Sequence, residues 1–371
     1  MKSKICYNRL TNIFFKFYIL KIGENFQKEC SMKKRYTIIF MLCCTAVLLC
    51  AGGKKEPAAA SASNTEGSSS KTASYTVKAV VPANAPAICI AKMAADNAAL
   101  AEGAVTEYEV LQAPDMLQAR LLSGEADIAI VPSNLSAILY AKGTGIRFAG
   151  AVVWGILYGL ASEPVSSIED LRGKTVITFG RGLTPDVTVR ELLNAYGLTP
   201  DKDVSFTYVQ SGQEAAAAFI SGKASFVILP EPMVSMVLTK KSDAKVFLDV
   251  QAAWKEKLGG DSSYPQAVVV VQKSLLENHP DYIKSFLAQL DTSITWAKEN
   301  PKEAGEAVAK LQKGIQAPLI AKGISRMNMQ FVNAEQTRPA LERYFSILHK
   351  ADPKFIGGAL PQDDFYYSPA K

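Results

Sequence analysis

Beyond its first fifty residues the sequence has a single cysteine, Cys89, and the whole chain has two histidines, His279 and His349. One cysteine cannot form an internal disulfide, and the two histidines have neither the spacing nor the neighbouring cysteines of a zinc site. No serine-centred nucleophile motif is present, and no histidine is placed to serve one as a base. These absences argue against a disulfide framework and a hydrolase, and we expect no metal and no cofactor.

The chain also lacks a charge excess outside its N-terminus. The 371 residues carry a formal net charge of +6, but residues 1–49 alone hold 9 basic and 2 acidic residues. The remainder has 32 basic and 33 acidic residues, a net charge of −1. Nucleic-acid binding relies on clustered positive charge, so we expect no nucleic-acid partner.

The N-terminal residues have the order of a secretory signal. Lys33, Lys34 and Arg35 precede an apolar run over 36–49 that is short for a membrane span. We therefore expect residues 1–49 to be an N-terminal extension followed by a signal peptide, with translation starting at Met32. A short membrane anchor is the alternative.

Cys50 ends the apolar run and precedes Ala-Gly-Gly-Lys-Lys. This resembles a bacterial lipoprotein processing site, where the cysteine is lipidated, although Leu49 replaces the usual small residue. Cys44 is a second candidate, and cysteine as apolar filler is a third interpretation. Residues 50–74 are rich in Ala, Ser and Gly, which is typical of a flexible tether. We expect an exported lipoprotein, anchored to a membrane, in the periplasm or at the cell surface.

One pattern occurs twice in the body of the chain, as SGEADIAIVPSN over 123–134 and SGKASFVILPEP over 221–232. The repeat extends further. Strands expected to start at 75, 107 and 127 recur at 174, 204 and 225, with expected helices between them. The sequence therefore predicts two similar α/β lobes, each built on a βαβαβ sheet flanked by helices.

The remaining segments connect these lobes. An apolar stretch over 147–161 leads into the second lobe, 245–250 and 267–271 lead back, and the tail from Lys273 is expected to be helical. We predict a first lobe of residues 75–155 and 262–371 and a second lobe of residues 156–261. Two hinge crossings would join them into a clamshell.

Ligands of open parallel sheets bind beyond the carboxyl ends of the strands. The candidate ligand-binding residues follow expected strands or lie at the crossings: Asn84, Ser133, Asn134, Trp154, Gly180, Arg181, Thr184, Glu231 and Tyr264.

Each candidate also has an ordinary interpretation. Ser133, Asn134 and Thr184 suit helix N-termini, and the loop from Gly180 to Thr184 suits a plain strand-to-helix turn. Trp154 and Tyr264 suit core packing, and Glu231 suits a solvated strand end. As a ligand site, this mostly neutral set favours a small planar or heterocyclic solute, with Glu231 accepting hydrogen bonds from its N–H groups.

The stretches LLSGEADIAIVPSN, IEDLRGKTVITFGRG, SGKASFVILPEP and QKSLLENHPDYIKSFL resemble solute-binding proteins of ABC importers. The family includes binders of sulfonates, taurine, nitrate and the pyrimidine precursor of thiamine, and is thiamine-precursor-synthase-like. The resemblance covers most of 75–345. It implies a type II periplasmic-binding fold that captures a solute and delivers it to a membrane permease and its ATPase, and we expect a monomer.

An enzyme on the same fold is the alternative, similar to a pyrimidine-precursor synthase or a menaquinone-pathway enzyme, because fold alone does not decide function. The export signal and the lack of histidines near the expected cleft favour binding over catalysis.

Overall fold

The computed structural model describes residues 74–111, 114–312 and 314–368. These residues belong to one compact unit, Ser70–Lys371. The expected signal peptide, the start at Met32, the lipidation at Cys50 and nearly all of the tether lie outside the described residues. Within the described ranges, no helix is long and apolar enough to cross a bilayer.

Six strands form the first sheet, in the order β11–β4–β10–β3–β1–β2. Their bounds are β1 (Tyr75–Pro82), β2 (Ala104–Leu111), β3 (Ile128–Pro132), β4 (Ile146–Val153), β10 (Ala267–Gln272) and β11 (Met329–Asn333). Strand β1 pairs in parallel with β2 and β3, whereas β10 runs antiparallel to β3 and β4. The central strands β3 and β10 are almost continuously buried, as expected for a sheet covered on both faces.

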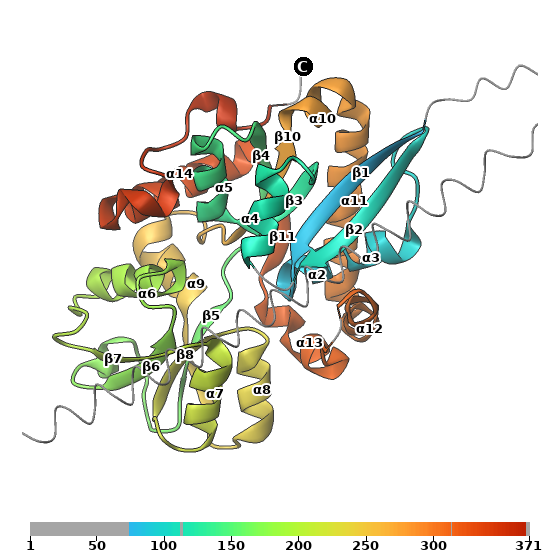
Figure 1. Ribbon diagram of the computed structural model, residues 1–371. Helices are drawn as coiled ribbons and strands as arrows, with labels where there is room; N and C mark the ends of the chain where they lie inside the picture. Colours follow the sequence, from blue (N-terminus) through green and yellow to red (C-terminus); the bar gives the residue numbers. More distant parts are fainter. Residues whose placement is uncertain (1–73, 112–113, 313, 369–371) are drawn as a thin grey trace, which may run out of the picture. The chain divides into compact units, whose positions relative to one another are not determined.

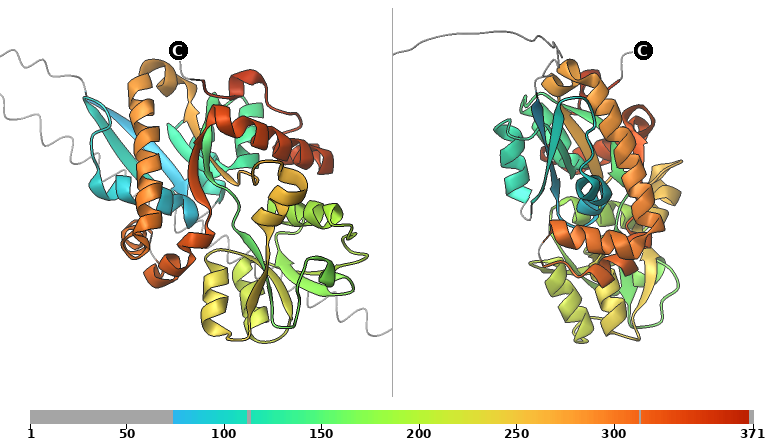
Figure 2. Two further views of the ribbon diagram at one scale, coloured as in Figure 1. Left: turned by 180° about the vertical axis from the view of Figure 1, so that it is seen from behind. Right: turned by 90° about the vertical axis from the view of Figure 1, so that its right-hand side faces the viewer.

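Helices from both ends of the described chain cover this sheet. They are α2 (Ala85–Cys89), α3 (Ala91–Asp96), α4 (Pro114–Leu122), α5 (Ser133–Ala141), α10 (Lys273–Asn278), α11 (Pro280–Glu299), α12 (Pro301–Leu311), α13 (Ala317–Gly323) and α14 (Ala334–Ala351), with short 3₁₀ turns η3 (Ile324–Arg326), η4 (Pro353–Ile356) and η5 (Asp363–Phe365). Figures 1 and 2 show α11 on one face of the sheet and α4 and α5 on the other. Consecutive β1 residues point to opposite faces, and Ala79 and Val80 accordingly belong to different apolar clusters. We call this sheet with its helices the first lobe.

Five strands form the second sheet, in the order β7–β6–β8–β5–β9. Its elements are β5 (Leu157–Ala161), η1 (Glu169–Leu171), β6 (Thr175–Phe179), α6 (Thr184–Ala195), β7 (Ser205–Val209), α7 (Gly212–Ile220), β8 (Phe226–Pro230), α8 (Met233–Lys240), β9 (Lys245–Asp249), α9 (Val250–Trp254) and the π-helical turn η2 (Lys255–Gly259). Strand β6 pairs in parallel with β7 and β8, while β5 runs antiparallel to β8 and β9. We call this sheet with its helices the second lobe.

The strand orders confirm the predicted α/β architecture with a repeated βαβαβ unit. In both sheets the first strand of the unit lies between the other two, as β2–β1–β3 and as β7–β6–β8. Both sheets also take antiparallel strands beside the third strand of the unit, so they are mixed rather than purely parallel. The helix expected between the strands starting at 75 and 107 is two short helices that meet at Ile90, and the second ends at Asn97 in a left-handed conformation.

The described chain passes from the first sheet to the second between β4 and β5, and returns between β9 and β10. We call residues 154–156 the first crossing and residues 250–266 the second crossing. The apolar stretch 147–161, which reads as one segment, is therefore two strands interrupted at the first crossing.

Candidate functional site at the crossings

The carboxyl ends of β3 and β8, the third strands of the two repeated units, adjoin the crossings. Ser133, just beyond β3, donates its N–H to the carbonyl oxygen of Gln266 at 3.0 Å and its Oγ–H to that of Pro265 at 2.6 Å. Glu231, just beyond β8, donates its N–H to the carbonyl oxygen of Ile156 at 3.1 Å. The strand end of each lobe is thus held by a segment that joins the lobes.

A side-chain amide links these two ends. The Oε1 atom of Gln266 accepts a hydrogen bond from the N–H of Ile156 at 3.0 Å. Ser133, Gln266, Ile156 and Glu231 therefore form one hydrogen-bonded chain between the lobes. The two copies of the sequence repeat, which end in Pro-Ser-Asn and Pro-Glu-Pro, are linked here through Gln266 and Ile156. Asn134, the next residue of α5, is half-buried beside Ser133.

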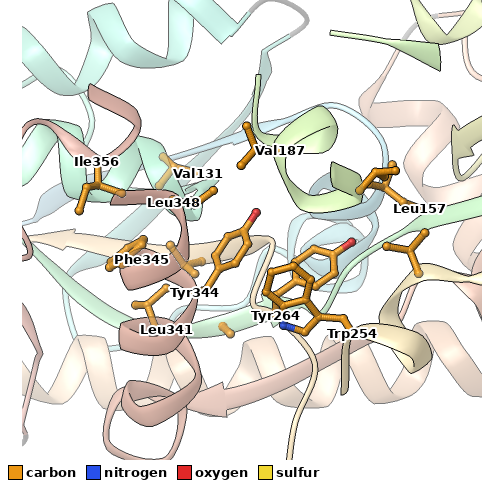
Figure 3. Close-up of a cluster of buried hydrophobic side chains, with 14 of the residues drawn as sticks. Val131, Leu157, Val187, Trp254, Tyr264, Leu341, Tyr344, Phe345, Leu348 and Ile356 are labelled. Carbon is orange, nitrogen blue, oxygen red and sulfur yellow. The ribbon is translucent and has the colours of Figure 1, made fainter. Parts of the chain in front are cut away.

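Tyr264 lies in the second crossing, inside an aromatic cluster (Figure 3). Its ring stacks on Tyr344 with centroids 5.3 Å apart and meets the edge of Trp254 at 5.2 Å. Its hydroxyl donates to Gln251 Oε1 at 3.2 Å, and burial raises the pKa of the phenol well above its ordinary value. The residue is buried on all sides. Its ring therefore packs in the core in this structure and does not face an open ligand pocket.

Gly155 lets the first crossing lie against this cluster. Its φ is +84°, and an added Cβ would lie 2.4 Å from Gln251 Cγ and 2.8 Å from Tyr264 Cζ. Asn328, with a φ of +44°, donates from Nδ2 to the carbonyl oxygen of Gly155 at 3.0 Å. Gly155 of the crossing and Asn328, which bonds to it, therefore both lie in the left-handed region, where a side chain is disfavoured.

Trp154 is half-buried and lines two adjoining cavities, of about 750 and 650 Å³. Both cavities are also lined by Lys255, Ser263, Asn328 and Gln330. The indole Nε1–H donates to the carbonyl oxygen of Gln330 at 3.1 Å, which fixes the ring beside the cavities. Such volumes suit a small organic molecule.

Glu231 is neither solvated nor open to a ligand. Its side chain is 0% exposed, and its Oε1 accepts a hydrogen bond from Arg326 Nε at 2.5 Å. The N–H and Oγ–H of Ser235 donate to the same carboxylate at 3.2 and 3.1 Å. A ligand cation would have to compete with the guanidinium of Arg326, which the sequence-based interpretation of Glu231 did not include.

Asn84 is the N-cap residue just before α2, with a φ of +71° and without a side-chain capping bond. It is half-buried, and its N–H donates to Gln312 Oε1 at 3.1 Å. Gln312 is a further contact that lies 228 residues away in sequence, so no local pattern points to it.

The loop over 180–184 precedes α6. Gly180 and Gly182 have φ values of +67° and +69°, and the Gly182 N–H is already bound by Asp186 Oδ2 at 2.8 Å. Arg181 is exposed, with its guanidinium 5.2 Å from the ring centroid of Tyr208. Thr184 is half-buried at the helix start.

The structure thus gathers Ser133, Asn134, Trp154, Glu231 and Tyr264 around the crossings. Among the hydrogen bonds of the described residues, none joins Asn84 or the loop 180–184 directly to this group. They stand at the carboxyl ends of β1 and β6, on the sheet edges to which Ser133 and Glu231 belong. In the described part of the chain, no cluster of three or more His, Cys, Asp or Glu side chains is placed to hold a metal ion.

Comparison with known proteins gives matches across most of the described chain. Residues 107–304 match the family described as NMT1/THI5 like. The Bacillus subtilis (strain 168) protein named "Putative binding protein YtlA" is 24% identical over 235 residues, which span 62% of this chain and 68% of that protein.

Solved structures show the same fold. The crystal structure of an ABC transporter from Parabacteroides distasonis has a TM-score of 0.68 and 25% identity, and the match covers 80% of this chain and 99% of that one. The periplasmic aliphatic sulphonate binding protein SsuA from Escherichia coli has a TM-score of 0.63 and 17% identity, over 80% of this chain and 93% of that one. These relatives are named as binding proteins or transport components rather than enzymes, in line with the expectation that the chain is not an enzyme.

Proposed function

Because the chain belongs to the NMT1/THI5-like family, we propose that it is the extracytoplasmic solute-binding protein of an ABC importer. In this proposal residues 75–155 and 262–371 form one lobe and residues 156–261 the other. The lobes capture a small organic solute between them, and the loaded protein delivers it to a membrane permease driven by its ATPase. The protein acts as a monomer in this cycle.

The observation that carries the proposal is the hydrogen-bonded chain from Ser133 through Gln266 and Ile156 to Glu231. It links the carboxyl-end edges of two α/β sheets, where folds of this kind bind ligands, to the two crossings, and connections between rigid bodies are suited to hinge motion. A solute between these edges would contact both lobes, so its binding energy would favour their closure.

We further propose that the solute has a planar or heterocyclic body. Trp154 supports this, since its indole is held by Gln330 beside cavities of suitable size, although none of the other candidate residues lines those cavities. Polar contacts would come from Asn84, Ser133, Asn134, Arg181 and Thr184, with the glycine-rich turn at Gly180 allowing close backbone approach. Because Glu231 is neutralised by Arg326, its contribution would be made through that pair rather than as a free acceptor.

Native mass spectrometry of the purified protein tests the proposal, followed by calorimetric titration of any co-purifying molecule. We expect one molecule to bind unchanged. Trp154→Ala should weaken its affinity roughly tenfold, since an aromatic contact contributes about 0.5–1.5 kcal/mol beyond its buried area. Trp296→Ala, on α11, is the matched control and should leave the affinity unchanged. Conversion of the molecule would instead identify an enzyme, and equal affinities of the two variants would exclude Trp154 from the site.

We also propose export and lipidation at Cys50, with residues 50–74 as the tether to the membrane. The support is the order of basic residues, apolar run and cysteine in the sequence. Cys50→Ser should lose the lipid and leave the membrane fraction, whereas Cys44→Ser should remain acylated. The opposite result would move the processed cysteine to Cys44.

A further inference from the structure

The segment from α13 to η3 belongs to the first lobe by its apolar side chains. Ile320, Ile324 and Met327 are buried in the apolar cluster that also contains α11. On its other side the segment contacts α8 of the second lobe. It therefore bridges the lobes outside the two crossings.

The contacts with the second lobe are polar. Arg326 donates from Nε to Glu231 Oε1 at 2.5 Å and from Nη2 to Ser235 Oγ at 2.8 Å. The Tyr158 hydroxyl, from β5, donates to the carbonyl oxygen of Arg326 at 2.8 Å. Three residues of the second lobe thus hold one arginine of the first.

Gly323 makes room for the carboxylate. An added Cβ would lie 2.9 Å from Glu231 Oε2 and 3.1 Å from Ser235 Oγ. With its side chain seated beneath α13, Glu231 is 0% exposed, while the Arg326 side chain remains 30% exposed. A buried carboxylate requires a hydrogen-bonded cation, so the buried position of Glu231 depends on its pairing with Arg326.

A second contact between the lobes is mainly aromatic rather than ionic. Tyr344 of α14 meets Thr188 of α6 through their hydroxyls, 3.0 Å apart, and packs against Tyr264 and Trp254. Figures 1 and 2 show the α13–α8 and α14–α6 contacts on opposite sides of the crossings. Separating packed aromatic rings exposes apolar area to water, whereas a separated carboxylate and guanidinium are rehydrated.

From this asymmetry we infer that Glu231 and Arg326 form a reversible latch between the lobes, with the aromatic cluster as the pivot. Arg326 is a positioning residue: it fixes the end of β8 against the first lobe and holds the lobes in the arrangement of this structure. The inference rests on contacts within the protein and stands independently of the proposed solute.

Hydrogen exchange of the full-length protein without added solute tests the latch. In Arg326→Ala, amides over 231–240 and 317–328 should exchange roughly tenfold to a hundredfold faster, as expected for loss of a charge-assisted hydrogen bond. Amides of the strands over 128–132 and 226–230 should keep their wild-type rates. Arg326→Lys, which keeps the charge but loses the fork to Ser235, should lie between the two proteins.

Arg338→Ala is the matched control, because Arg338 pairs with Glu342 and Asp363 inside the first lobe and is 38% exposed. It should leave 231–240 and 317–328 unchanged. Where Arg326→Ala folds poorly, the Glu231→Gln and Arg326→Gln double variant removes both charges at similar volume and should show the same local effect. Equal acceleration over 226–230 would reduce the pair to an ordinary structural contact, and unchanged exchange over 231–240 would overturn the latch.

Discussion

Replacement of Gly155 by alanine should test how tightly the first crossing is built. Gly155 has a φ of +84°, and its Cα faces Gln251 and Tyr264. Alanine in the left-handed region costs about 1–2 kcal/mol. Its methyl group would also overlap Gln251 Cγ, from which it would be separated by 2.4 Å.

This overlap is not easily relieved. Gln251 Oε1 accepts hydrogen bonds from the Leu157 N–H at 2.8 Å and from the Tyr264 hydroxyl at 3.2 Å. Tyr264 is itself enclosed by Trp254 and Tyr344. Overpacking of a well-packed site costs about 1–3 kcal/mol, so the substitution should destabilise the protein by roughly 2–5 kcal/mol in total.

Thermal unfolding followed by tryptophan fluorescence measures this effect. At roughly 2–4 °C per kcal/mol, Gly155→Ala should lower the Tm by about 5–15 °C. Gly173→Ala is the control, since Gly173 has a φ of +75° but no atom within 4 Å of an added Cβ. It should bear the backbone cost alone. If the two variants had Tm values within about 1 °C of each other, the packing of Gln251 and Tyr264 against the crossing would be refuted.

Two further predictions concern Tyr264 of the second crossing and Tyr158 of β5. Tyr264→Phe keeps the stacking but loses the hydrogen bond to Gln251, so the free energy of unfolding measured in urea should fall by about 0.5–1.5 kcal/mol. Tyr264→Ala also removes the ring and should lower it by about 3–5 kcal/mol. A loss of solute affinity in Tyr264→Phe without a loss of stability would instead indicate that Tyr264 contacts the ligand. Burial, with a smaller effect of Asp249, raises the pKa of Tyr158 to about 12, against about 10 when unfolded. Above pH 10 the unfolded chain therefore binds fewer protons, and the stability present below pH 10 is lost as the pH rises towards 12. Urea midpoints at about pH 9 and pH 11 should fall less steeply in Tyr158→Phe than in the wild type, and equal slopes would contradict the raised pKa.

Local sequence patterns predicted the repeated unit because its strands and turns are written in neighbouring residues. The runs DIAIV and SFVIL read as buried strands, and both became the third strand of a βαβαβ unit, β3 and β8. The same reasoning placed the boundary between the lobes at 155/156 but did not predict the ends of β4 and β5 there, since hydrophobicity continues from 147 to 161. Gly155 was the available signal of an interruption between two strands, but a lone glycine in an apolar run does not show which residues pack against it.

The contacts of the candidate site were less accessible to sequence reasoning. Tyr264 and Trp154 are both aromatic residues near a crossing, yet one is enclosed by Trp254 and Tyr344 and the other lines two cavities. Only tertiary packing separates these outcomes. Arg326 lies 95 residues from Glu231, and nothing in the sequence around either residue indicates the other.

The difference between the two repeat ends now has a physical basis. Ser133 is neutral, and its bonds to Pro265 and Gln266 are made to a crossing that continues into its own sheet. Glu231 carries a charge into a fully buried position, and that charge is tolerable only when a cation of the other lobe reaches it. A neutral residue at 231 would not require a cation, so the end of β8 would be about equally stable in either arrangement of the lobes. The carboxylate makes one arrangement depend on Arg326, and this asymmetry between otherwise similar lobes is what a reversible latch requires.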